Sequence, residues 1–487
     1  MRRILWIACL CTLVLTGCQP AADDPTAGIS FSVDTLCFGT VFTDMSSSTR
    51  VVMVRNRTKQ PQLIEKVLQA DGRYFRINLD GESSAAYLNN IRLQAGDSLY
   101  LFVNAKIDEQ TSDLPVLVTD QVIFVMGDGS KKTLQIEAYG QDVTLIDSLY
   151  IDADYTFRAG KPYLIRHYVA SARGTTLTIE AGTVFYMHKD AQVHVYGSLV
   201  APGTAEAPIL FTCERQDDYV AGIPYAYVPG QWGGIYLYDY DGQAPTWLAS
   251  GLRIVSAING LYCYGKNAQQ RPTLSLSGSV IHNHDQYGLV LLNVDADVSN
   301  SEISNCASHC LYIQGGTSRF EQNTIASYYR HTMYNSNVGL YDTRREDVSA
   351  VYVDNLSKTV PTRVSFVNNI ITGVRSEQLM IASPLPDYYS GTFRCNYIKG
   401  DTLRLAGASG NVYSQDTDTK QVDTVFLNDY YADYVYYDFR LDSLSPARGI
   451  ADSAVMSKYP QDLLGVTRTT LDAGCYAYVN DTTFSRP

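Results

Sequence analysis

Apolar and polar residues alternate in short runs from Ile29 to about Val143, as they do in Ser98–Val103 and in Val122–Val125. Turn residues such as Asp71-Gly72 separate these runs. Because successive side chains of a β-strand point to opposite faces, this alternation predicts short strands with one buried face. Several such strands over about a hundred residues predict a β-sandwich for residues 29–143.

A longer period governs the rest of the chain. Apolar residues recur 22 positions apart in two series, which are Ile281, Ile303, Ile325 and Leu289, Leu311, Met333. Ile371 and Leu379 rejoin the pattern two turns later, after an inserted loop. The repeats consist of short β-branched segments with Asn- and Gly-containing turns, which excludes helical repeats. The step predicts a parallel β-helix, in which each coil buries its apolar face only by stacking on the next coil.

Motifs at both ends of this region resemble the right-handed parallel β-helix of the pectin-lyase-like superfamily. They are Leu177–Thr183, Val193–Leu199, Gly203–Ala205, Pro208–Thr212 and Trp232–Ile235 at the start, and Phe439–Leu441, Ser445–Ala447, Asp462, Gly465, Arg468 and Asp472–Tyr476 at the end. The resemblance implies a β-helix with a closing segment over residues 150–480. It implies no single activity, since the superfamily includes lyases, hydrolases, adhesins and proteins of no known role.

The first region carries a resemblance of its own. Its segments Phe38–Val41, Val54–Asn56, Leu93–Asp97 and Phe102-Val103 are similar to the immunoglobulin-like modules at the front of many Bacteroidota surface lipoproteins. The resemblance implies that residues 29–143 form an immunoglobulin-like β-sandwich that acts mostly as a spacer. The whole chain is therefore expected to be all-β, a sandwich followed by a right-handed parallel β-helix.

The first residues have the pattern of an export signal. Arg2 and Arg3 precede a short apolar stretch, and Leu15-Thr16-Gly17-Cys18 follows it with the small residues of a lipobox. This resembles bacterial lipoproteins and implies that residues 1–17 are a signal peptide and that Cys18 carries a lipid. The alternative is an ordinary secretory leader with a cysteine at the cut. Residues 18–28 are small, polar and acidic, which predicts a disordered tether.

The tether and the charge bear on location and partners. Acidic residues soon after Cys18 resemble the surface-export signals of Bacteroidota lipoproteins, so we expect a lipid-anchored outer-membrane protein that faces the cell exterior. The formal net charge of -12 argues against nucleic acid as a partner.

The later cysteines are odd in number and lack CxxC spacing, which indicates separate buried thiols and no zinc site, although Cys306 and Cys310 could pair in an oxidising compartment. Phosphate-loop, HExxH, nucleophile-elbow and dinucleotide motifs are missing from the sequence, so no cofactor or metal is expected.

Tyrosines are the most regular polar feature of the repeats. If Ile235, Leu261, Leu289, Leu311 and Met333 point inward, the residue after each of them points outward. The outward tyrosines are then Tyr236, Tyr262, Tyr312 and Tyr334 in one column, with Tyr238 and Tyr264 in a second column. Such a ladder offers apolar rings with hydroxyl tips, which suits the sugar rings of an extended polymer. The alternative is that these tyrosines cover the sheet or pack under the loop from Asp342 to Pro361.

Other side chains could support catalysis. Tyr287, His309 and His331 are spaced 22 residues apart in a turn, near His282 and His284, and a histidine can act as a general base. Lys266 and Arg271 lie in an inserted loop and could supply the base and the charge partner that a uronate lyase needs. Stacked turn rings and a solvated loop are the structural alternatives.

Carboxylates offer a further pattern. A glycosidase pair could come from Asp239, Asp241, Asp285, Asp295 or Asp297, although Asp295 and Asp297 also fit a turn. Arg468, Asp462 and Asp472 in the closing segment fit buried ion pairs that cap the end of the solenoid.

These patterns favour a binding or adhesion protein that holds an extended glycan, or another surface polymer, on its tyrosine-lined face. A polysaccharide lyase or glycoside hydrolase on the same scaffold is the main alternative. A purely structural surface protein is a third possibility. The expected partners are a polysaccharide and, through the lipid on Cys18, a membrane.

Overall fold

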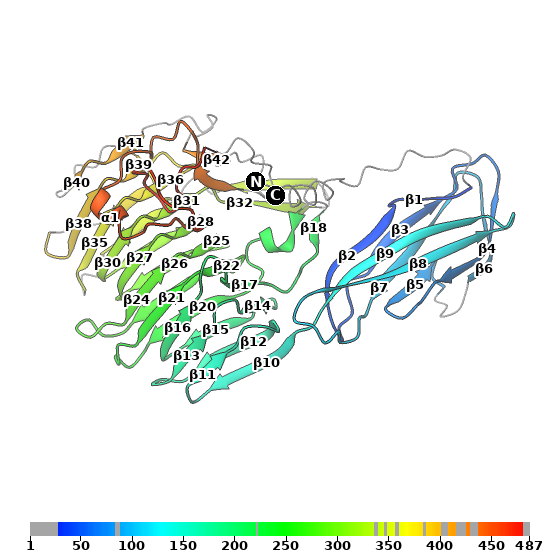
Figure 1. The fold of residues 1–487 in the computed structure, drawn as a ribbon, viewed down its shortest axis with the longest axis horizontal. Helices are drawn as coiled ribbons and strands as arrows, with labels where there is room; N and C mark the ends of the chain where they lie inside the picture. The colour runs from blue at the N-terminus through cyan, green and yellow to red at the C-terminus, as the bar shows by residue number, and fades with distance from the viewer. Residues whose placement is uncertain are drawn as a thin grey trace, which may run out of the picture. The chain divides into compact units, whose positions relative to one another are not determined.

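The computed structural model describes residues 28–82, 88–220, 223–335, 339–344, 348–355, 360–382, 386–400, 408–414, 425–428 and 437–480. The predicted signal peptide, Cys18 and most of the predicted tether lie outside these residues. The chain divides into two compact units, Met1–Val143 and Thr144–Pro487. In the described ranges both are built almost entirely of strands, with one four-residue helix, α1 (Ser453–Met456), and one 3-10 turn, η1 (Tyr225–Tyr227) (Figure 1).

The first unit is a two-sheet β-sandwich, as the alternating pattern predicts. One sheet has the order β1 (Ser30–Phe31), β3 (Arg50–Arg55), β7 (Ser98–Ala105), β5 (Phe75–Leu79). The other has the order β2 (Thr35–Phe42), β9 (Lys131–Gln141), β8 (Val116–Met126), β4 (Gln62–Gln69), β6 (Leu88–Leu93), and β2 pairs with β9 in parallel. The inward residues of both sheets, among them Val52, Leu101 and Phe124, are fully buried in one core.

The second unit is a parallel β-helix whose coils each contribute up to three strands. The first face consists of β14 (Val184–Met187), β17 (Ile209–Cys213), β22 (Leu252–Val255), β25 (Val280–His284), β28 (Glu302–Cys306), β31 (Thr324–Ser327), β36 (Ile370–Gly373), β39 (Tyr397–Lys399) and β41 (Val412–Ser414). The second face consists of β15 (Gln192–Val195), β20 (Gly234–Asp239), β23 (Leu261–Gly265), β26 (Leu289–Leu292), β29 (Leu311–Gln314), β34 (Val351–Asp354) and β37 (Leu379–Ala382). β10 (Thr144–Ile151) and β12 (Tyr163–Ser171) join these two faces into one 18-stranded sheet.

The third face is a separate 10-stranded sheet. It consists of β11 (Tyr155–Phe157), β13 (Thr176–Ile179), β16 (Ser198–Pro202), β21 (Thr246–Ser250), β24 (Thr273–Ser277), β27 (Asp295–Ser299), β30 (Gly316–Glu321), β35 (Thr362–Val367), β38 (Tyr389–Arg394) and β40 (Ala408–Ser409). Figure 1 shows these strands side by side along the β-helix. The remaining strands lie in insertions or at the end of the chain, and are β18 (Asp218–Val220), β19 (Ile223–Pro224), β32 (Arg330–Asn335), β33 (Gly339–Arg344), β42 (Phe426–Asn428) and β43 (Asp438–Leu441).

The 22-residue period corresponds to strand register in the first face. Ile281 pairs with Ile303, Ile303 with Ile325, and Ile325 with Ile371, and all four side chains are fully buried. Each isoleucine therefore stacks on the equivalent residue of the next coil, as the sequence predicts. Phenylalanines stack in the same way inside the β-helix, with the ring centroids of Phe185 and Phe211 4.5 Å apart.

One predicted step of the period is wrong. Met333 does not continue the series of Leu289 and Leu311, because Val351 pairs with Leu311 and Leu379 with Val351. Met333 lies instead in β32, which forms an antiparallel hairpin with β33. The hairpin is inserted into one long coil, so the residues from Ile325 to Ile371 make one turn and not two. An insertion about as long as one coil preserves the 22-residue spacing in the sequence, although its residues do not stack on the neighbouring coil.

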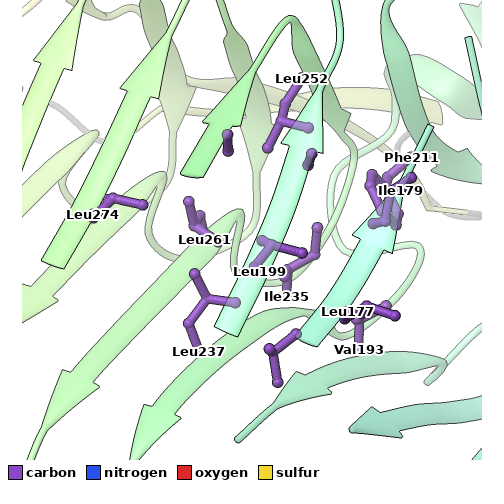
Figure 2. A pocket seen from close by; sticks show the side chains of 13 residues that line it. Leu177, Ile179, Val193, Leu199, Phe211, Ile235, Leu237, Leu252, Leu261 and Leu274 are labelled. Carbon is purple, nitrogen blue, oxygen red and sulfur yellow. The ribbon is translucent and has the colours of Figure 1, made fainter. Parts of the chain in front are cut away.

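The apolar interior is closely packed. Thirteen side chains, including Leu199, Leu237 and Leu261, surround a void of about 10 Å³ without any polar lining (Figure 2). A single water needs about that much space and several polar partners. The void is therefore a packing defect and does not serve as a ligand site.

A ladder of asparagines joins the coils at the turn from the third face to the first. The Oδ1 atom of Asn369 accepts hydrogen bonds from the backbone N–H and the Nδ2 of Asn323, at 2.9 and 3.0 Å. Asn396 accepts the same pair from Asn369, and Asn411 accepts it from Asn396. The residue before each ladder position has a left-handed backbone, as at Asn368 with φ 60°. The ladder thus satisfies buried turn donors that no strand partner reaches.

The closing segment, residues 437–480, packs against the first face. Its Phe439, Leu441, Ala473 and Tyr476 share a core with outward residues of that face, such as Ile370. Cys475 N–H donates to Thr324 Oγ1 at 3.1 Å, and Gln322 Nε2 donates to Gly474 O at 3.0 Å. The segment therefore covers the side of the coils that the first face presents.

The charges predicted to pair in this segment lie near one another without a direct contact between their described side chains. Arg468 is buried and donates to Asn300 Oδ1 at 2.8 Å. Burial lowers the pKa of Arg468, and the nearby carboxylates of Asp462 and Asp472 oppose this shift. Asp462 accepts instead from the backbone N–H groups of Leu464 and Ala477 at 2.8 and 3.0 Å. These carboxylates hold the turns of the closing segment itself, because their short side chains reach nearby backbone donors.

We expect Asn369→Ala to destabilise the β-helix by about 1–3 kcal/mol, since it leaves the buried N–H of Asn323 without its acceptor. The midpoint of chemical denaturation measures the effect. Ser443→Ala, at an exposed turn of the closing segment, is the control and should shift the midpoint very little. An unchanged midpoint for Asn369→Ala would contradict a stabilising ladder.

Candidate functional site

Tyrosines of neighbouring coils lie in register on the second face. Tyr236 pairs with Tyr262 and Tyr238 pairs with Tyr264 across β20 and β23. The residues between them, such as Leu237 and Cys263, are fully buried inside the β-helix. The four tyrosines are partly exposed, because outward side chains alternate with buried ones along each strand.

Three further rings extend this group. His194 pairs with Tyr236 from the preceding coil, and their ring centroids are 5.3 Å apart and nearly parallel at 16°. Tyr196 lies 5.9 Å from Tyr238, and Tyr240 lies 4.9 Å from it. We call the following seven residues the tyrosine cluster: His194, Tyr196, Tyr236, Tyr238, Tyr240, Tyr262 and Tyr264. Sequence reasoning missed His194 and Tyr196 because the coil between β15 and β20 is longer than the 22-residue period, and it missed Tyr240 because this residue lies just beyond the end of β20.

The tyrosine cluster ends at the coil of β26. Val290 occupies the column there and is buried, with 3% of its surface exposed. Beyond it, the rings of Tyr312 and Tyr352 lie 5.7 Å apart and nearly parallel at 10°. The expected neighbour, Tyr334, lies in the inserted hairpin and its side chain is outside the described residues. Tyr352 takes its place because Val351 and not Met333 stacks on Leu311.

Three tyrosines of this face, Tyr238, Tyr262 and Tyr312, have raised pKa values and therefore keep their hydroxyl protons at neutral pH. Burial raises the pKa of Tyr238 and of Tyr262 above the ordinary value of 10, and nearby tyrosines raise both further. Burial and a hydrogen bond to Asp354, 2.7 Å from the phenol oxygen, raise the pKa of Tyr312. Tyr236 donates to Gly233 O at 3.2 Å. The face therefore combines apolar ring surface with neutral hydroxyl groups.

Among the described residues, the predicted histidine column places His309 beside other aromatic rings. The ring of His309 stacks on Tyr352 at 4.7 Å, and its Nδ1 lies 2.8 Å from Ser349 O. Tyr287 lies 6.2 Å from the same ring. His331 lies in β32, and its side chain is outside the described residues. His309 therefore belongs to the group of rings around Tyr312.

The two histidines near this turn are structural. His284 is fully buried, and burial together with His282 lowers its pKa to about 3, so its ring is neutral. His282 Nδ1 lies 2.7 Å from Ser304 Oγ and 3.5 Å from Glu302 Oε1. Tyr476 of the closing segment donates to Glu302 Oε2. This network lies under the closing segment and fixes that segment to the first face.

Lys266 and Arg271, the two residues considered for a lyase, have different partners in the structure. Arg271 donates to both carboxylate oxygens of Asp295, from Nε at 2.8 Å and from Nη2 at 3.0 Å. The side chain of Lys266 is exposed, and its backbone N–H donates to Asp239 O. Arg271 therefore ties the inserted loop to the next coil.

The carboxylates considered for a glycosidase have separate partners. Asp239 accepts from the backbone N–H groups of Gly242 and Gln243 and shapes a turn. The remaining contacts are Asp241 with Arg173 at 3.7 Å, Asp285 with Tyr329 at 3.4 Å, Asp295 with Arg271 and Asp297 with Arg319 at 2.9 Å. No contact links any two of these five carboxylates, all of which are described.

Three further observations concern cysteines, metals and membranes. Cys306 and Cys310 are both free thiols and both fully buried. Within the described ranges, no group of three or more His, Cys, Asp or Glu side chains is placed to hold a metal ion. No helix in that part of the chain has the length and apolar character needed to cross a membrane.

Comparison with known proteins agrees with the fold. Residues 233–402 match the family described as "right handed beta helix region". Together with the long parallel sheets, the match identifies a right-handed parallel β-helix. A search of curated proteins found no match.

Solved structures are similar over about a quarter of the chain. One is a PapD-like domain of human CEP192, with 11% identity and a TM-score of 0.17, covering 27% of this chain and 95% of that one. A family 123 glycoside hydrolase from Clostridium perfringens has 6% identity and a TM-score of 0.18, covering 26% and 30%. A protein of unknown function from Porphyromonas gingivalis W83 has 12% identity and a TM-score of 0.18, covering 27% and 60%. The chain thus spans less than two thirds of the last two proteins.

The Glu302 network makes stability depend on pH. Burial raises the pKa of Glu302, but hydrogen bonds from His282, Ser304 and Tyr476 outweigh burial, and the net pKa falls below 4.5. A carboxylate with a lowered pKa stabilises the fold above its unfolded pKa, and this contribution is lost as pH falls through the folded pKa. As the pH is lowered below about 4.5, the melting temperature should therefore decrease. The decrease should be less steep in Glu302→Gln. Glu206→Gln is the control at an exposed turn. Parallel slopes for Glu302→Gln and the unmodified chain would contradict this role.

Proposed function

We propose that this protein binds an extended glycan along the tyrosine cluster of its second face. The observation that carries the proposal is the contiguity of seven aromatic rings contributed by three successive coils. Tyr240 has 42% of its surface exposed, and the other rings are partly exposed. Sugar rings have apolar C–H faces that pack on aromatic side chains, while their hydroxyls bond to polar neighbours.

The shape of the scaffold supports a polymer as the ligand. Successive coils repeat about every 4.8 Å along the β-helix. The tyrosine cluster therefore extends along the coils as a strip rather than as an enclosed pocket. A strip of rings binds a chain of sugars through several weak contacts, and each contact adds to the affinity.

The other regions are consistent with display of this strip at a cell surface. We infer that Cys18 carries a lipid anchor in the outer membrane, that the tether follows it, and that the sandwich acts as an immunoglobulin-like spacer. The support for the anchor is the lipobox Leu15-Thr16-Gly17-Cys18 behind an export signal. The support for the spacer is a compact first unit with its own core.

Removing two rings should abolish glycan retention. We expect the double variant Tyr238→Ala, Tyr262→Ala to bind an array glycan at least about tenfold more weakly, because it loses adjoining stacking surface. Tyr262→Phe retains the ring and should retain most of the binding. Tyr139→Ala is the matched control, since Tyr139 is 44% exposed on the sandwich. Retention of the double variant at the level of the unmodified chain would contradict the proposal, provided that both have the same melting temperature.

The anchor has a separate test. Cys18→Ala should move the protein from the membrane fraction to the soluble fraction, because a thioether-linked lipid can no longer form. Cys11→Ala, within the apolar stretch of the signal, is the control and should leave the protein with the membranes. Continued membrane association of Cys18→Ala would show that the anchor does not depend on this residue.

A further inference from the structure

A groove of about 800 Å³ runs across the third face, away from the tyrosine cluster. It crosses β21, β24, β27, β30, β35 and β38, which lie side by side in Figure 1. One row of outward side chains follows the strand register across it, namely Leu248, Ser275, Asp297, Arg319, Ser365 and Thr392. The groove therefore extends over successive coils and suits an elongated ligand.

Among the described residues, the charges in the groove leave one guanidinium, that of Arg363, without a hydrogen bond or ion pair. Asp295 is held by Arg271 through two hydrogen bonds, and Asp297 is held by Arg319 Nη2 at 2.9 Å. Arg363 is exposed and also lines the groove. Arg319 keeps further N–H donors, since a guanidinium has five and only one contacts Asp297. The two arginines and two aspartates of the lining balance in formal charge, and Arg271, paired with Asp295 beside the groove, adds one positive charge in a chain with a formal net charge of -12.

Carboxylates at the ends of strands that line the groove are also neutralised. Glu321, at the end of β30, accepts from Lys458 Nζ at 3.0 Å and from the Tyr459 hydroxyl at 2.8 Å. Asp452, the N-cap of α1, pairs with Arg394 at the end of β38, at 2.6 Å. The closing segment therefore contacts the ends of β30 and β38 through paired carboxylates. An anionic ligand meets no uncompensated carboxylate among these residues.

The lining indicates which kind of polymer fits. It is rich in hydroxyl groups, from Thr273, Ser275, Thr317, Ser365, Ser390 and Thr392, and the lining residues in the described ranges include no aromatic ring. The strands beneath are paired on both sides, so a peptide cannot add as a further strand. A hydroxyl-rich, charge-compensated groove favours a polar sugar chain over an apolar peptide.

The positions of the two arginines favour sulfate as the anionic group. Arg319 pairs with Ser365 and Thr317 pairs with Arg363, so the two arginines are diagonal neighbours on β30 and β35. A carboxylate has two oxygens, which a single guanidinium fork occupies. A sulfate ester presents three terminal oxygens and can accept from both arginines together. We propose that the groove of the third face is a second binding site, for a sulfated polysaccharide, with Arg363 and Arg319 holding a sulfate group.

Dextran sulfate, unsulfated dextran and carboxymethyl dextran are suitable matched probes for the full-length protein at about 0.15 M salt, where long-range attraction is screened. We expect dextran sulfate to bind and the other two to bind at least about tenfold more weakly. Arg363→Gln should weaken dextran sulfate binding about tenfold, the effect of losing one charge-assisted contact. Ser365→Trp should also block binding, because it fills the groove without changing its charge.

Controls separate this site from general charge effects and from the tyrosine cluster. Arg158→Gln removes an exposed arginine that is not part of the groove lining and should leave dextran sulfate binding unchanged. The Tyr238→Ala, Tyr262→Ala variant should also bind dextran sulfate normally, so failure of one site does not imply failure of the other. Unchanged binding in both Arg363→Gln and Ser365→Trp would overturn the site. Equal binding of carboxymethyl dextran would overturn its assignment to sulfate.

Discussion

Stacking of equivalent apolar side chains from coil to coil is the constraint on which the second unit depends. A single coil has too little apolar surface to pay for the conformational entropy of ordering it, so each coil is stable only on its neighbours. The paired isoleucines of the first face and the parallel phenylalanine rings within the β-helix are the result. In the part of the chain that the structure describes, two insertions lie in turns, where they interrupt no stack. The β32–β33 hairpin and the loop that contains Lys266 and Arg271 are both of this kind.

The same constraint organises the outer surface. Every second residue of a strand points into the interior, so the residues between them point outward. In successive coils these outward residues line up in rows, with one residue per strand. A row can then be aromatic, as in the tyrosine cluster, or hydroxyl-bearing and charged, as in the groove of the third face. Such rows match a repeating ligand because both have a regular spacing. Neither surface requires a strained backbone or an enclosed cavity.

The closing segment determines which faces remain open. It covers outward residues of the first face with Phe439, Leu441 and Tyr476, and buries Glu302 and Thr324 beneath them. The buried polar groups there are compensated, since Tyr476 donates to Glu302 and Thr324 accepts from Cys475. The second face and the groove of the third face keep their exposed side chains. Binding surfaces in this unit are therefore expected on those two faces.

The sequence by itself determined the all-β character, the sandwich and the β-helix, because alternation and the 22-residue period record burial directly. It also determined the columns of Tyr236, Tyr238, Tyr262 and Tyr264, since inward and outward positions follow from strand periodicity. Only the tertiary structure decided where the period breaks. Val351 replaced Met333 as the neighbour of Leu311, so Tyr352 lies beside Tyr312, because spacing along the chain cannot distinguish a stacked coil from an insertion of similar length. The pairing of Arg271 with Asp295 and the hydrogen bond from Arg468 to Asn300 join different coils or join a coil to the closing segment. Such contacts leave no local pattern in the sequence.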